Sequence, residues 1–188
     1  MLIYAIGVSV DGYIADRNGN FDWTPLSDAL FQMHTERVGA LAGYLLGRRL
    51  YEDMLVWETD PSMRDTPAGA AFADIWTALP KVVFSRTLES VRGNSRLATG
   101  SLAEEIAAAV GTGDAQIEIG GADLASQAIA LDLVDELRVF RSPAIVGGGT
   151  RHLPPLEHPL PLELVETRDF DSGVVSERYR RVGGRLGR

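Results

Sequence analysis

The chain has 188 residues, 45% of them hydrophobic and 23% charged, which is enough for one globular domain with its own core. It contains no cysteine, which excludes disulfide bonds, thiolate zinc sites and a cysteine nucleophile. The net charge is -8, and so acidic a protein is a poor partner for nucleic acid, because neutralising phosphates requires clustered lysine and arginine. The three histidines lack the spacing of metal ligands, so no metal site is expected.

The first half of the chain alternates strand-like and helix-like segments. Residues 2–10 form a continuous apolar run, which predicts a strand buried on both faces. The run has no basic start and no cleavage site, and no stretch is long enough to span a bilayer, so we expect a cytoplasmic protein without a membrane partner. Further patterns predict a helix at 27–41, a strand at 44–46, a helix at 48–54, a polar loop at 61–69 and a helix at 70–79.

The second half continues the alternation and ends in a hairpin. The other predicted elements are strands at 81–85, 117–121, 136–140 and 144–146, helices at 101–110 and 122–131, and paired strands at 162–165 and 174–181. This succession predicts one α/β domain over residues 1–182, followed by a flexible tail at 183–188. We expect a three-layer α/β/α fold with a mixed, mainly parallel central sheet and a C-terminal antiparallel hairpin.

Two glycines mark the junction between the predicted strand 117–121 and the helix after it. Gly120 and Gly121 would let a phosphate approach the main chain, and the helix start offers free N–H groups. The junction could equally be a tight strand-to-helix turn, since the usual G-x-G-x-x-G fingerprint is missing.

Basic and hydroxyl side chains follow two other predicted strands. Arg48 and Arg49 open a helix directly after Gly47, where the helix dipole disfavours cations, so a bound anion would explain the pair. Ser85 and Arg86 follow the strand at 81–85 in the same way. Because ligands of open parallel sheets bind at the carboxyl ends of strands, the co-occurrence favours a site for a small anionic ligand.

Several motifs, in this order and nearly over the whole chain, resemble the reductase domain of bacterial riboflavin biosynthesis and the wider dihydrofolate reductase-like superfamily. They are Ser9-Val10-Asp11-Gly12-Tyr13-Ile14-Ala15, Leu46-Gly47-Arg48-Arg49, Val83-Phe84-Ser85-Arg86, Ile119-Gly120-Gly121-Ala122, Leu133-Val134-Asp135-Glu136-Leu137 and Pro143 with Gly147-Gly148-Gly149. The resemblance implies a dihydrofolate reductase-like fold, an oxidoreductase activity and a free-standing reductase domain.

The resemblance also implies NADPH as cofactor. It assigns the phosphates to Gly47, Arg48, Arg49 and Leu50, the 2′-phosphate to Ser85 and Arg86, the pyrophosphate to Gly120, Gly121, Ala122, Asp123 and Leu124, and the nicotinamide to Ala5, Ile6 and Gly7. Arginine and serine suit a 2′-phosphate, whereas NADH enzymes place a carboxylate on the ribose. Leu50 departs from the threonine of many relatives and removes one hydroxyl contact.

Two carboxylates are candidates for the catalytic group. Asp11 follows the first predicted strand, where the nicotinamide would lie, but an aspartate before Gly12 also closes turns. Asp28 lies shortly after Trp23, as does the substrate-binding carboxylate in dihydrofolate reductases, but we favour the alternative that it is an acidic residue in the first turn of a helix. Both alternatives stay open for each residue.

The substrate is less defined than the cofactor. Riboflavin-pathway reductases usually have a glutamate directly before the glycine pair, where this chain has Ile119, and Glu118 would point to the other face of the strand. An apolar cleft floor argues against the ribityl-phosphate pyrimidine. We therefore expect an NADPH-dependent reductase of a small planar heterocycle or carbonyl. The alternatives are a riboflavin-pathway reductase with a variant pocket and a nucleotide-binding protein of this fold without reductase activity.

The resemblance further implies a homodimer. The apolar run at 137–146 could form its interface, although internal sheet core explains that run as well.

Overall fold

The computed structural model describes residues 1–183, and most of the predicted tail, 184–188, lies outside the described residues. An eight-stranded sheet runs in the order β5-β4-β3-β6-β1-β7-β10-β9. Its strands are β1 (Leu2–Val8), β3 (Gly43–Gly47), β4 (Lys81–Phe84), β5 (Ser95–Leu97), β6 (Ile117–Gly120), β7 (Glu136–Arg141), β9 (Leu162–Asp169) and β10 (Val175–Arg181). The strands from β5 to β7 are parallel, and β10 pairs antiparallel with β7 and β9. The mixed, mainly parallel sheet and the C-terminal hairpin are confirmed.

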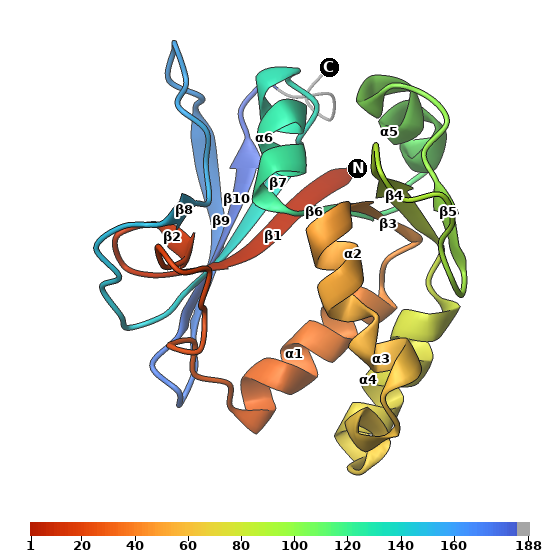
Figure 1. The fold of residues 1–188 in the computed structure, drawn as a ribbon. Helices are drawn as coiled ribbons and strands as arrows, with labels where there is room; N and C mark the ends of the chain where they lie inside the picture. The colour runs from red at the N-terminus through yellow and green to blue at the C-terminus, as the bar shows by residue number, and fades with distance from the viewer. Residues whose placement is uncertain (184–188) are drawn as a thin grey trace.

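Helices cover both faces of the sheet (Figure 1). One face carries α1 (Asp28–Gly39), α2 (Arg48–Met54), α3 (Val56–Thr59), the 3₁₀ turn η1 (Pro61–Arg64) and α4 (Pro67–Ala78), and the other carries α5 (Leu102–Val110) and α6 (Ala122–Ala130). Strand residues alternate between the two cores: Ile3 and Tyr44 pack toward α1 and α4, whereas Tyr4 and Leu45 pack toward α5 and α6. A second, two-stranded sheet joins β2 (Tyr13–Ala15) to β8 (Thr150–Arg151).

Two predicted segments differ from the structure. The expected polar loop at 61–69 is η1 plus the first turn of α4, because Asp60 and Thr66 accept hydrogen bonds from main-chain N–H groups and start both turns. The expected strand at 144–146 is a loop, because the N–H groups of Val146 and Gly147 are bound by the Asp11 carboxylate instead of a neighbouring strand. In residues 1–183 no helix is long and apolar enough to cross a membrane.

Candidate functional site

Two helix starts meet at the carboxyl edge of the sheet. β3 and β6 are parallel neighbours, so both end at this edge, and α2 and α6 begin directly after them. The N-caps are Gly47 for α2 and Gly121 for α6, and neither helix has a side-chain cap. The first N–H groups of both helices are therefore left without side-chain acceptors and can bind an anion.

The two glycines where β6 ends and α6 begins each have a physical reason. Gly121 has φ +93°, and a side chain there would lie 3.7 Å from the Gly47 nitrogen. A side chain at Gly120 would lie 2.3 Å from Leu50 and 2.9 Å from the Tyr44 hydroxyl. Gly121 is thus favoured by its left-handed backbone conformation, and Gly120 because a side chain there would displace Leu50 and Tyr44. We call Gly47, Gly120 and Gly121 the glycine cradle.

Basic and hydroxyl groups from the neighbouring strand ends flank the glycine cradle. Arg48 lies 3.3 Å from the Thr87 hydroxyl, and the hydroxyl of Ser85 accepts hydrogen bonds from the N–H groups of Thr87 and Leu88. Arg86 is exposed, and within residues 1–183 it forms no salt bridge. These groups supply the positive charge that an anion would need. Sequence reasoning overlooked Thr87, although it directly follows Ser85-Arg86.

The remaining predicted cofactor residues have different surroundings. Arg49 is exposed on the first turn of α2, Leu50 packs against Gly120, and Leu124 is buried on the side of α6 that faces the core. Asp123 is exposed and accepts a hydrogen bond from Gln127 along α6, so its carboxylate is held on the helix surface. A phosphate at this helix start would therefore be bound by main-chain N–H groups of Ala122 and Asp123 rather than by their side chains.

The end of β1 is open although β1 is a central strand. Its pairing with β6 stops at Tyr4 with Ile119, whereas its pairing with β7 continues to Val8. Ile6 and Gly7 are consequently half-buried, while most of β1, including Ala5, is buried. Residues 5–7 thus extend beyond the pairing with β6, at the same edge of the sheet as the glycine cradle, and Gly7 has open space next to it.

Asp11 is bound on three sides. Its carboxylate accepts hydrogen bonds from the Ser9 hydroxyl at 2.7 Å and from the N–H groups of Val146 at 3.0 Å and Gly147 at 2.7 Å. The Ser9 hydrogen bond contributes most to lowering the pKa of Asp11 to about 2. An acid of that pKa is ionised at neutral pH and cannot donate a proton efficiently. Of the two roles considered for Asp11, the structure favours closing the turn.

Asp28 is the first residue of α1 and is exposed, while Ser27 caps the helix by accepting a hydrogen bond from the N–H of Leu30. It therefore matches the description of an acidic first-turn residue. The helix face that packs on the sheet is formed by other residues, including Leu30 and Val38.

The two residues before the glycine pair do not line a cleft, although an apolar cleft floor was expected at Ile119. Ile119 is fully buried in the core on the α5 and α6 side, so it does not line a cleft. Glu118 is fully buried on the α1 side and forms an ion pair with Arg37 of α1. Burial and this carboxylate raise the pKa of the neighbouring Tyr44 hydroxyl well above its ordinary value. Sequence reasoning missed the contact because its two residues are 81 positions apart.

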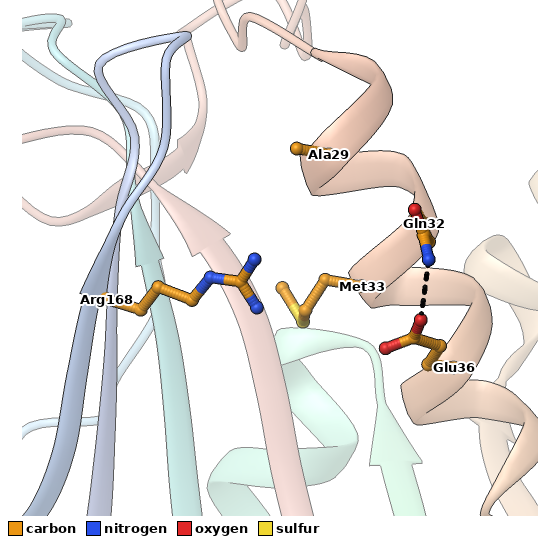
Figure 2. A pocket seen from close by; sticks show the side chains of 5 residues that line it. All are labelled: Ala29, Gln32, Met33, Glu36 and Arg168. Carbon is orange, nitrogen blue, oxygen red and sulfur yellow. Dashed lines mark hydrogen bonds between the residues drawn. The ribbon is translucent and has the colours of Figure 1, made fainter.

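A small hollow between α1 and β9 is separate from these groups. It has a volume of about 100 Å³ and is lined by Ala29, Gln32, Met33, Glu36 and Arg168. Figure 2 shows the Arg168 side chain extending from β9 toward Met33, with Gln32 hydrogen-bonded to Glu36 at 2.8 Å. Ligand pockets for drug-sized molecules measure roughly 300–1,000 Å³. This hollow is smaller and contains none of the predicted site residues.

Two proteins of known sequence or structure are similar to this chain over nearly its whole length. The uncharacterized protein YyaP of Bacillus subtilis (strain 168) is 27% identical over 180 residues, which cover 95% of this chain and 93% of that protein. A solved structure from Shewanella sp. PV-4, provisionally named for riboflavin biosynthesis, has a TM-score of 0.74 at 26% identity and covers 96% of this chain and 98% of its own.

Two further solved structures share the fold at lower identity. A pyrimidine reductase-like protein of Corynebacterium diphtheriae has a TM-score of 0.65 at 13% identity, with 96% and 91% of the two chains covered. The diaminohydroxyphosphoribosylaminopyrimidine deaminase/5-amino-6-(5-phosphoribosylamino)uracil reductase of Thermotoga maritima has a TM-score of 0.65 at 19% identity, over 97% of this chain and 56% of that one. Residues 1–176 match the model of the RibD C-terminal domain, and the chain therefore belongs to that family.

Proposed function

We propose that the protein is an NADPH-dependent reductase of a small planar heterocycle or carbonyl. The observation that carries the proposal is the meeting of two helix starts without side-chain caps at Gly47 and Gly121, with Arg48 and Arg86 beside them. Membership of the RibD C-terminal domain family supports an oxidoreductase. NADPH, when bound, supplies the hydride that reduces the substrate.

The residues at the carboxyl edge fit such a cofactor. Main-chain N–H groups at the starts of α2 and α6 would bind the pyrophosphate, and Arg48 and Arg86 would neutralise phosphate charge. Arg86 with the Ser85 hydroxyl would select a 2′-phosphate over a free ribose hydroxyl. The open end of β1 at Ile6 and Gly7 would receive the nicotinamide.

The test is a fluorescence titration of the purified protein with NADPH and, separately, with NADH. We expect NADPH to bind at least about tenfold more tightly, because one charge-assisted hydrogen bond contributes ~1.5–3 kcal/mol. Equal affinities would contradict the assigned 2′-phosphate site, and absence of binding would contradict the reductase. NADPH binding without oxidation of NADPH across a panel of ketones and pterins would favour a nucleotide-binding protein without reductase activity.

We also propose a homodimer in the cytoplasm. The run at 137–146 does not offer the interface, because β7 lies inside the sheet between β1 and β10. The edge strand β9 is exposed along its length and carries Leu164 and Val165. Pairing with β9 of a second copy would satisfy its free main-chain groups. Light scattering that gives the mass of a monomer would contradict the dimer.

A further inference from the structure

The main chain of Gly120 rests on the aromatic ring of Tyr44. Tyr44 of β3 lies diagonally across from Gly120 in the sheet, and a side chain at Gly120 would point to the same face as Tyr44, the one that carries α1 and α4. A β-carbon at Gly120 would lie 2.7 Å from the Cε1 atom of Tyr44 and 2.9 Å from its hydroxyl oxygen. Non-bonded carbon atoms pack at about 3.5–4.0 Å. The ring therefore limits how far the end of β6 can move toward this face.

The ring of Tyr44 is itself fixed by two neighbours. It packs edge-on against Trp76 of α4, with 5.5 Å between the centroids and 70° between the planes. Its hydroxyl hydrogen-bonds the carboxylate of Glu118, which lies directly opposite Tyr44 in β6. Burial and this carboxylate raise the pKa of Tyr44 well above its ordinary value, so the hydroxyl keeps its proton and is the donor. The ring is thus held in one orientation by α4 and β6.

The position of Gly120 is passed along the main chain to the start of α6. Gly121 follows directly as the N-cap, and its carbonyl accepts a hydrogen bond from the N–H of Ala125 at 2.9 Å. The other close contact of Gly120 is Leu50, but Leu50 is half-buried and touches Gly120 with the end of a flexible side chain. Binding groups must be held within about 0.5 Å by residues that packing locks in place. Of the two contacts, only Tyr44 is locked in this way.

We infer that Tyr44 is a positioning residue of the cofactor site, and that its ring sets the place of Gly120 and thereby of the N–H groups at the start of α6. The inference rests on the proposed function, since the pyrophosphate is there assigned to these N–H groups. Tyr44 acts through Gly120 rather than by touching the cofactor, because it is buried on the inner side of the strand. A core aromatic residue therefore determines cofactor affinity in addition to stability.

The experiment compares the full-length wild type with Y44L, G120A and the double variant that carries both substitutions. Y44L removes the outer part of the ring, on which Gly120 rests, and G120A adds the β-carbon that presses against this part of the ring. The double variant places that β-carbon in the space that the ring has left. Y44F keeps the ring and removes only the hydroxyl. NADPH affinity is measured for each protein by fluorescence titration.

F72L is the matched control. Phe72 is a buried aromatic residue of the same core, and it packs on other aromatic side chains of that core. We expect Y44L and G120A each to weaken NADPH binding at least about tenfold, and the double variant to recover to within about threefold of the wild type. Y44F and F72L should also stay within about threefold. If Tyr44 contributed only to stability, the two losses would add and no recovery would occur.

A second measurement does not depend on the cofactor. In Y44L without NADPH, hydrogen exchange should accelerate more at the Ala125 amide, which is bonded to Gly121, than at the Leu131 amide at the far end of α6. Equal acceleration at both amides, or full NADPH affinity in G120A, would overturn the role of Tyr44. G120A keeps the test decisive if Y44L does not fold. Failure of the wild type to bind NADPH would contradict the proposed function, while the exchange at Ala125 would still show whether Tyr44 positions the start of α6.

Discussion

The two sides of the carboxyl edge are built differently. On the side of β3, β4 and β6, the glycine cradle uses main-chain groups and side chains that directly follow strands. On the side of β1 and α1, the groups are side chains that α1, β6 and β7 bring together, including His34, Phe140 and the pair of Arg37 with Glu118. A common phosphate-bearing cofactor can be bound by main chain, whereas discrimination between substrates needs particular side chains.

The two sides also differ in how their groups contribute to the stability of the fold. The glycine cradle contains no charged side chain, while the α1 side holds a charged pair within the core: the Glu118 side chain is 0% exposed and that of Arg37 is 12% exposed. Buried pairs are weak evidence for stability but are strongly destabilising when one partner is removed. Substitutions in the buried pair should therefore act mainly on stability, whereas substitutions on the side of the glycine cradle should also act on cofactor affinity.

The largest effect is expected for E118A. Removing this carboxylate leaves the Arg37 guanidinium buried without its partner, so the free energy of unfolding should fall by about 3–5 kcal/mol. Urea denaturation of both proteins measures the change. D74A is the matched control, because it breaks the exposed pair with Arg64 and should cost less than about 1 kcal/mol.

A double variant sharpens this first prediction. R37M with E118L replaces both charges by apolar groups of similar size, and such replacements are often neutral. We expect the double variant to be more stable than E118A. If E118A and D74A cost the same, the α1 side does not hold an energetically important buried pair and the contrast between the two sides fails.

The next effect concerns the glycine cradle. Gly121 has φ +93°, so G121A should cost about 1–3 kcal/mol in stability and also displace the start of α6, weakening NADPH binding at least about tenfold. G19A is the matched control, because Gly19 has φ +86° in a distant turn with open space around it. It should lose similar stability and keep NADPH affinity. Equal losses of affinity in both variants would point to general destabilisation.

The glycine cradle and the α1 side also differ in how well the sequence predicts them. Strands, helices and the glycine cradle depend on local patterns, and the expected strand 117–121 and helix 122–131 match β6 and α6 closely. The expected strand at 144–146 was wrong because Asp11, 135 residues away from Val146, binds the main chain there. His34 and the pair of Arg37 with Glu118 escaped prediction for the same reason. Their neighbours are set by the packing of α1 on the sheet, which no local pattern records.

A smaller effect is expected for R86A, which tests how much a side-chain charge, as opposed to main-chain N–H groups, contributes to cofactor binding. R86A removes a guanidinium that forms no salt bridge in residues 1–183, so we expect little change in stability. NADPH affinity should fall about tenfold while NADH affinity stays the same, because only NADPH carries the 2′-phosphate. Parallel fluorescence titrations measure both. R64A is the control: it changes another exposed arginine, which lies in η1 and not at the carboxyl edge of the sheet, and it should leave both affinities unchanged.

The smallest effect is expected for D11N, which tests whether Asp11 closes a turn. The N–H groups of Val146 and Gly147 bind different oxygens of the Asp11 carboxylate, and in asparagine one of these becomes an NH2 group that cannot accept, so hydrogen exchange at this turn should accelerate. D16N is the control, since the Asp16 carboxylate accepts hydrogen bonds from the N–H groups of Asn18 and Asn20 and, in residues 1–183, from neither Val146 nor Gly147.

The pH dependence of D11N follows from the lowered pKa of Asp11. Because that pKa falls from 3.8 to about 2 on folding, the carboxylate stabilises the fold above pH 4, and this stabilisation is lost as the pH falls through 2. The thermal midpoints of wild type and D11N should therefore differ at pH 7 and converge near pH 2. A reductase turnover number for D11N within about threefold of the wild type is expected, since general acid catalysis contributes about 10²–10⁴-fold. A loss of that larger size would instead make Asp11 the proton donor of the reaction.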